Sequence, residues 1–199
     1  MTLMTRRTFG ATLAAGAVAA TVARPAAALD LASAKDLIGR AIGEVNSVIN
    51  SGKSETAMYG SFERIFAKYA DVSAIARSAL GPAARSASAG QMKAFTAAYQ
   101  GYISRKYGRR FREFIGGKIE VVDAKPLKSY FEVISIARLQ GEAPFDLRWH
   151  VSNKSGRDLF FNIIIEGVNM LASEREEVGA MLKQQKGDID ALIAALKSA

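Results

Sequence analysis

The pattern of apolar and polar residues predicts helices in the first half of the chain. Apolar side chains recur at steps of three and four residues in segments 31–51, 54–69 and 72–80, which is the spacing of one face of a helix. Ser51-Gly52 and Gly81-Pro82 provide stop signals after the first and third segments. We therefore predict three helices before residue 83.

The longest helical pattern starts at Ser88 and runs to about residue 115. Ser88 and Gln91 form a capping box, in which each side chain bonds the backbone N–H of the other residue. A broad apolar and aromatic stripe follows, with Phe95 and Tyr99 among its members. Such a stripe is typical of core packing, and it is also typical of the wall of a ligand cavity.

Beyond residue 117 the pattern changes from helical spacing to alternation. Strand-like stretches lie near residues 118–124, 129–139, 144–153 and 158–166. The segment Asn153-Lys154-Ser155-Gly156 between the last two is typical of a β-hairpin. We predict an α+β fold in which a four-stranded antiparallel sheet, apolar on one face, packs on a helical bundle.

The apolar face of this sheet mixes large and small side chains. In the second strand the large Phe131 and Val133 share a face with the small Ser135 and Ala137, and in the third strand alternation puts Trp149 on the apolar face. Small side chains among large ones leave unfilled space on this face of the sheet. This indicates an apolar pocket between the sheet and the helices.

The start of the chain has the layout of an export signal. Arg6-Arg7 precede a weakly apolar run at 11–23, and the small residues Ala26-Ala27-Ala28 follow. Paired arginines are typical of the twin-arginine route, and the run is shorter than the ~20 residues of a membrane span. We predict a cleaved twin-arginine signal peptide at 1–28 and a single periplasmic domain at 29–199.

The amino-acid composition excludes several kinds of functional site. Among 199 residues there is no cysteine and one histidine, the formal charge is +8, and 49% of the residues are hydrophobic. Disulfides, thiol catalysis and thiolate metal sites are therefore excluded, and His150 falls on the outer face of its strand, where we expect a surface position. No nucleophile elbow or glycine-rich phosphate loop is present. We predict no catalytic residue, metal or cofactor, and no enzymatic activity.

Basic residues cluster near the end of the long helix. They are Arg105, Lys106, Arg109, Arg110 and Arg112. Such a cluster is typical of a solvated helix face, and it is also suited to an anionic lipid headgroup or an acidic partner surface.

Several segments, taken in order, resemble one family. They are the Phe95…Tyr107-Gly108 stretch, Phe145-Asp146-Leu147-Arg148-Trp149, the segment 161–168 and Gly187-Asp188-Ile189-Asp190-Ala191-Leu192. Together they are similar to the MlaC, or toluene-tolerance, family of periplasmic phospholipid carriers, over roughly residues 33–197. The chain departs from the family pattern at Asn162, where an aspartate is common, so this position supplies an uncharged amide in place of a carboxylate.

The resemblance implies a mixed α+β fold with a deep apolar pocket that takes acyl chains and leaves the headgroup near solvent. It also implies that a monomeric carrier passes phospholipid between an outer-membrane lipoprotein and porin complex and an inner-membrane ABC transporter with a membrane-anchored substrate-binding subunit. This function maintains the lipid asymmetry of the outer membrane. No cofactor, covalent step or nucleic acid is involved.

We predict that the pocket wall is formed by the apolar face of the sheet and the inner sides of the helices. The predicted lipid-binding residues are Phe66, Tyr69, Ile103, Tyr107, Phe111, Phe131, Val133, Trp149, Phe161, Ile163 and Val168.

Two other functions are compatible with such a pocket. One is an exported chaperone or binding protein for a different apolar cargo, such as a polycyclic lipid or a lipoprotein, which the mass of the bound ligand would distinguish. The other is a small cone-shaped α+β enzyme. An enzyme requires an acid–base pair inside the cavity, so the presence of a buried Asp–His or Asp–Tyr pair is its structural test.

Overall fold

The computed structural model describes residues 29–110 and 114–199. The predicted signal peptide, Phe111 and Arg112 lie outside the described residues. In chain order the elements are α1 (Leu31–Ile49), α2 (Glu55–Tyr69), α3 (Val72–Leu80), the 3-10 turn η1 (Gly81–Arg85), α4 (Ala89–Arg110), β1 (Lys118–Leu127), β2 (Tyr130–Arg138), β3 (Phe145–Ser152), β4 (Leu159–Ile165), β5 (Val168–Asn169), α5 (Met170–Gln184) and α6 (Ile189–Ser198).

Local capping explains why the helices begin where the sequence predicts. Ser54 accepts a hydrogen bond from the backbone N–H of Ala57 at the start of α2. At the start of α4 the capping box is formed in both directions: Ser88 N–H donates to Gln91 Oε1 at 3.0 Å, and Gln91 N–H donates to Ser88 Oγ at 3.1 Å. The described part of α4 ends at Arg110, before the predicted limit of about 115.

The sheet has five antiparallel strands, not the four that we predicted, in the order β1-β2-β3-β4-β5. The additional strand has two residues, which is too short to show an alternating pattern. It forms because Glu166 and Gly167 both have positive φ, 49° and 81°, so that the chain reverses and Val168 pairs with Ile165. Helix α5 begins directly after this strand.

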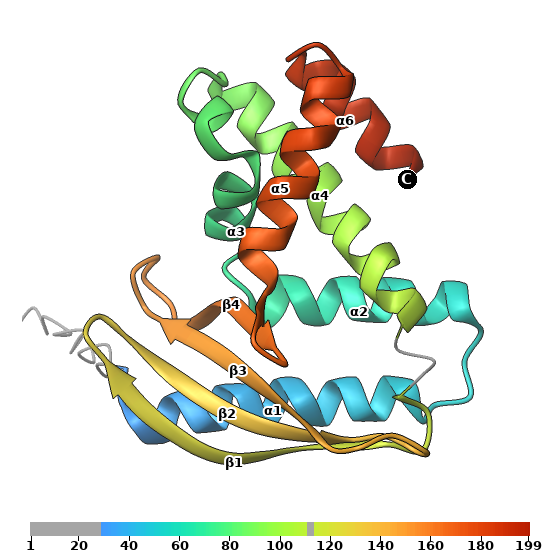
Figure 1. Cartoon of the computed structure of the whole chain (residues 1–199), viewed down its shortest axis with the longest axis vertical. Helices are drawn as coiled ribbons and strands as arrows, with labels where there is room; N and C mark the ends of the chain where they lie inside the picture. The colour runs from blue at the N-terminus through green and yellow to red at the C-terminus, as the bar shows by residue number, and fades with distance from the viewer. Residues whose placement is uncertain (1–28, 111–113) are drawn as a thin grey trace, which may run out of the picture.

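Figure 1 shows two parts joined by α2. The sheet lies with α1, which packs on β1 and β2. Helices α3, α4, α5 and α6 gather on the other side of α2, which contacts both α1 and α4. Where α2 meets α3, the N–H of Asp71 donates to the carbonyl of Phe160 at 2.8 Å, so this junction is held against β4. The fold therefore sets β3 and β4 opposite the helical part.

His150 is buried, and our prediction of a surface position was wrong. Its exposed fraction is 8%, because Glu132, His150 and Asn162 stand opposite one another on three neighbouring strands and their side chains meet. His150 Nε2 lies 3.4 Å from Glu132 Oε2. The rings of Tyr130 and Phe161 lie 4.7 and 5.7 Å from the imidazole, centroid to centroid, and contribute to its burial.

Candidate functional site: an apolar cavity with one polar corner

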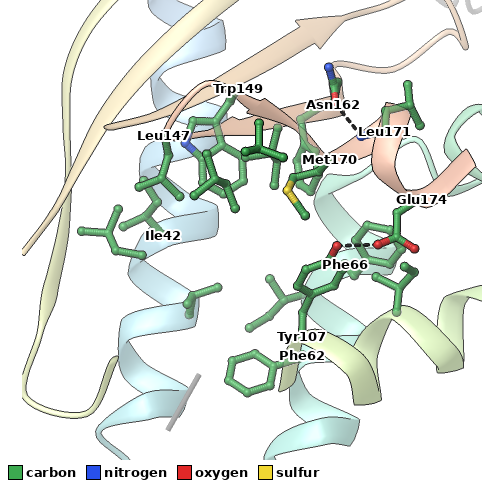
Figure 2. A pocket seen from close by; sticks show the side chains of 18 of the residues that line it. Ile42, Phe62, Phe66, Tyr107, Leu147, Trp149, Asn162, Met170, Leu171 and Glu174 are labelled. Atoms are coloured by element: carbon green, nitrogen blue, oxygen red, sulfur yellow. Dashed lines mark hydrogen bonds between the residues drawn. The ribbon is translucent and has the colours of Figure 1, made fainter. Parts of the chain in front are cut away.

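A cavity of about 530 Å³ lies between β3 and β4 and the helices α1, α2, α4 and α5. Leu147, Trp149 and Ile163 form its sheet wall, and most of the other side chains that border it are also apolar. Figure 2 shows Leu147 and Trp149 near Ile42 of α1, with Phe62 of α2 farther along the cavity. Its volume lies within the 300–1,000 Å³ typical of sites that enclose small ligands.

Many of the predicted lipid-binding residues line this cavity. They come from α2, α4, β3, β4 and β5, and they are Phe66, Ile103, Tyr107, Trp149, Phe161, Ile163 and Val168. Residues of the predicted set therefore border the cavity from both the sheet and the helices, and their contact with lipid stays a prediction.

Three predicted residues lie elsewhere in the fold. Phe131 and Val133 of β2 do not border the cavity, because α1 packs on β1 and β2 and covers that part of the apolar face. Tyr69 is buried, and its hydroxyl donates to Glu44 Oε1 at 2.8 Å. The small residues Ser135 and Ala137 are fully buried and do not line the cavity either, so the room that we expected beside them is filled.

The sequence analysis missed a buried carboxylate in the cavity wall. Glu174 of α5 is 3% exposed, and its Oε1 accepts hydrogen bonds from the Tyr107 hydroxyl and from Lys106 Nζ at 2.7 Å. One turn later the outer carboxylate Glu177 also binds Lys106 and accepts a hydrogen bond from Tyr102. Figure 2 shows Glu174 meeting Tyr107 at the opposite end of the cavity from Leu147.

A sequence signal for Glu174 existed. Met170, Glu174 and Val178 follow one another at steps of four residues, so they share one face of α5. Met170 lines the cavity and Val178 is fully buried. A charged residue between two inward apolar positions is unusual and indicates a paired or functional group.

The electrostatics of this cluster determine the protonation states of Lys106 and Tyr107. Burial raises the pKa of Tyr107, and the hydrogen bond to Glu174 and its negative charge raise the pKa further. Burial alone would lower the pKa of Lys106, but its two carboxylate partners outweigh burial, so the net pKa is raised. Lys106 therefore stays charged and Tyr107 stays protonated at neutral pH.

The rim of the cavity is exposed and partly acidic. Glu142, Glu166 and Val168 border the cavity and are all exposed, with 53% of Val168 accessible. Glu142 lies in the β2–β3 loop, Glu166 lies in the β4–β5 turn, and Val168 begins β5, which places the exposed rim at this end of the strands.

Part of the basic cluster is committed to contacts within the fold. Arg105 donates to the carbonyls of Leu196 and Ala199 at 2.7 and 2.9 Å, where it caps the end of α6. Lys106 is bound by the two carboxylates of α5. Arg109 is exposed, Arg110 ends α4 and Arg112 lies outside the described residues.

Within the part of the chain that the structure describes, no group of three or more His, Cys, Asp or Glu side chains is placed to hold a metal ion. A search of the same residues finds no helix long and apolar enough to cross a membrane.

Comparison with known proteins identifies both a family and a similar fold. The family model described as "MlaC protein" matches residues 39–198. The fold is similar to the solved structure of the phospholipid-binding protein from Ralstonia solanacearum in complex with a phospholipid, with a TM-score of 0.71 over 83% of this chain and 95% of that chain. The two sequences are 15% identical, so this second likeness concerns the fold.

Proposed function

This chain belongs to the MlaC protein family, a family of lipid-binding carriers, and on this basis we propose that it binds phospholipid in the periplasm and carries it between the two membranes. The observation that carries the proposal is the apolar cavity of about 530 Å³ between the sheet and the helices. A protein of the same fold holds a phospholipid in its solved structure, which supports the proposal.

The energetics of lipid transfer explain why such a cavity suits a carrier. Each methylene that leaves water for an apolar environment gains about 0.8 kcal/mol, so a lipid tail of many methylenes does not cross an aqueous gap unaided. A cavity walled by Ile42, Phe62, Leu147 and Ile163 offers the tail an environment similar to the membrane interior. Because the carrier performs no work, the direction of transfer is set by the membrane complexes at either end.

We propose as partners an outer-membrane lipoprotein and porin complex and an inner-membrane ABC transporter with its membrane-anchored substrate-binding subunit. Transfer between them would maintain the lipid asymmetry of the outer membrane. The arginines at the end of α4 and just beyond it are the candidate surface for an anionic lipid headgroup or an acidic face of one of these complexes. Among them, Arg109 is exposed.

The enzyme alternative has one structural point in its favour, because Glu174 and Tyr107 form a carboxylate–tyrosine pair in the cavity wall. However, the raised pKa of Tyr107 keeps its hydroxyl protonated at neutral pH, so the phenolate that would act as a general base is not populated. Ser104, a serine of α4 that borders the cavity, donates to the carbonyl of Gln100 at 2.9 Å. These contacts suit a binding site better than a reaction centre.

Native mass spectrometry of the exported protein tests the proposal. We expect an added mass equal to one phospholipid, which lipid extraction and fragmentation then identify by headgroup and chains. A bound polycyclic lipid or lipoprotein would support the alternative of a carrier for another cargo. Protein that is recovered without any lipid, and that takes up none from phospholipid vesicles, would contradict the proposal.

A further inference from the structure

Two buried polar atoms in the cavity wall have no hydrogen-bond partner among the described residues. They are Oε2 of Glu174 and the hydroxyl oxygen of Tyr99. Tyr99 is fully buried on α4, Glu174 is 3% exposed on α5, and both residues border the cavity. We call Glu174, Tyr99 and Tyr107 the polar corner.

The donors that reach Glu174 are engaged at its other oxygen, Oε1. The Tyr107 hydroxyl donates a hydrogen bond to Oε1 of Glu174. Lys106 Nζ bridges Oε1 of Glu174 and Oε2 of Glu177. The second oxygen of Glu174 is thus left as a buried acceptor, which is costly unless a donor reaches it. The charge of Glu174 also raises the pKa of the Tyr99 hydroxyl, in addition to the larger effect of burial, so the two groups share one electrostatic environment.

We propose that the polar corner binds a hydrogen-bond donor of the lipid headgroup, and that the donor it fits best is a primary ammonium. This inference rests on the proposed function. A primary ammonium has three N–H donors and a positive charge, so it is suited to Oε2 of Glu174, where the hydrogen bond is charge-assisted on both sides. A quaternary ammonium has no N–H to donate, and a phosphate is repelled by the carboxylate.

The arrangement of the cavity supports an amphipathic ligand in one orientation. Figure 2 shows Leu147, Trp149 and Ile42 at one end and Tyr107 with Glu174 at the other. A lipid whose chains lie against the sheet and α1 would direct its polar part toward α4 and α5. Lys106, whose side chain is 29% exposed, lies beside Glu174, so the polar corner is close to the protein surface.

The test is a competition between headgroups. The full exported protein is incubated with vesicles that contain equal amounts of phosphatidylethanolamine and phosphatidylcholine with identical chains, and native mass spectrometry measures the two bound forms. We expect about tenfold enrichment of the ethanolamine lipid in the wild type, the ratio that one net charge-assisted hydrogen bond supplies. In Glu174→Gln the ratio should fall close to one.

Glu177→Gln is the matched control. Glu177 is on the same helix and binds the same lysine, but its side chain is 44% exposed and it does not border the cavity, so the enrichment should remain. Tyr99→Phe gives a second reading if Glu174→Gln does not fold. The preference of the Tyr99→Phe variant for the ethanolamine lipid should fall in part. The lipid-free variant should melt at a higher temperature than the lipid-free wild type, because a buried hydroxyl without a partner has been removed.

The outcomes separate this inference from the proposed function. Equal binding of both lipids by the wild type would overturn the inference alone, as would full enrichment in a folded Glu174→Gln variant. Binding of neither lipid would overturn the proposed function as well.

Discussion

The indole nitrogen of Trp149 donates a hydrogen bond to the hydroxyl of Ser135, 3.0 Å away on the neighbouring strand. Ser135 is fully buried and Trp149 is 8% exposed, so the bond lies inside the protein. Trp149 pairs with Val133 in the sheet register, which makes Ser135 its diagonal neighbour. The small serine therefore accommodates and orients the ring that forms part of the cavity wall.

This relationship predicts the effect of Ser135→Ala. The substitution leaves the indole N–H buried without a partner, which should lower the free energy of unfolding by about 1–3 kcal/mol. Urea denaturation measures the loss. In a Trp149→Phe background the same substitution should have almost no effect, because the donor is already absent. An equal loss in both backgrounds would show that the hydrogen bond is not the cause.

Adding bulk inside the cavity should reduce lipid binding. Ile163 lines the cavity and the next residue, Ile164, does not. Ile163→Trp is therefore expected to reduce the amount of co-purified phospholipid severalfold while the fold remains, as far-UV circular dichroism would show. Ile164→Trp is the matched control and should retain its lipid. Normal lipid content in Ile163→Trp would place the ligand elsewhere.

The structure changes which sheet position should be used for this experiment. The mixture of large and small residues in the second strand predicted room beside Ala137, but Ala137 is fully buried and does not border the cavity. A tryptophan there would overpack the core, at a cost of about 1–3 kcal/mol or more. Ala137→Trp should therefore lower the melting temperature before it affects binding.

Charge reversal at the end of α4 should slow the delivery of lipid. Arg109, Arg110 and Arg112 are the positions to change, because Arg105 and Lys106 make contacts within the fold. Exposed charges act mainly on the encounter rate and are screened over about 8 Å at physiological salt. The triple glutamate variant should deliver lipid to anionic vesicles more slowly, with a larger effect at low salt. Delivery that depends on neither charge nor salt would assign these residues to a solvated face.

The buried His150 predicts a dependence of stability on pH. Burial lowers its pKa below the ordinary 6.5, although the nearby Glu132 carboxylate opposes this shift. The unfolded chain then takes up a proton at a higher pH than the folded protein does. The stability that neutral His150 contributes is therefore fully present above about pH 6.5 and decreases as the pH falls through the range below it.

Urea unfolding of the wild type and of His150→Gln between pH 8 and pH 5 checks this sign. The wild type should lose stability below about pH 6.5, and the variant should not show this loss. Glu132 acts in a lower range: burial would raise its pKa, but Lys125, His150 and Arg148 bring it below the ordinary 4.5, so its contribution is lost only at more acidic pH. A pH profile that is the same in both proteins would exclude His150 as the titrating group.

Export should depend on the paired arginines. Arg6→Lys combined with Arg7→Lys is expected to leave precursor in the cytoplasm, and the mature wild-type protein is expected to begin at Leu29, within a residue or two. Cell fractionation and N-terminal sequencing measure both results. Unchanged export of the double variant would assign the protein to the general secretory route.

The local pattern of the chain was sufficient for helices α1 to α4, for strands β1 to β4 and for the apolar face of β3 and β4, but not for the two-residue strand β5. Periodicity, capping residues and turn residues act over a few positions, so the helix starts at Ser54 and Ser88 and the β3–β4 hairpin could be predicted from sequence. The same alternation identified Trp149 and Ile163, which line the cavity.

Only the tertiary structure decided which parts of that apolar surface border the cavity. Phe131 and Val133 have the same pattern as Trp149, but α1 covers their part of the sheet, and sequence spacing contains no information about this long-range contact. The burial of His150 and of Glu174 has the same explanation, because each polar residue is covered by groups that are distant in the chain. Alternation determines the side on which a residue lies, whereas its burial and its partners depend on which elements pack against that side.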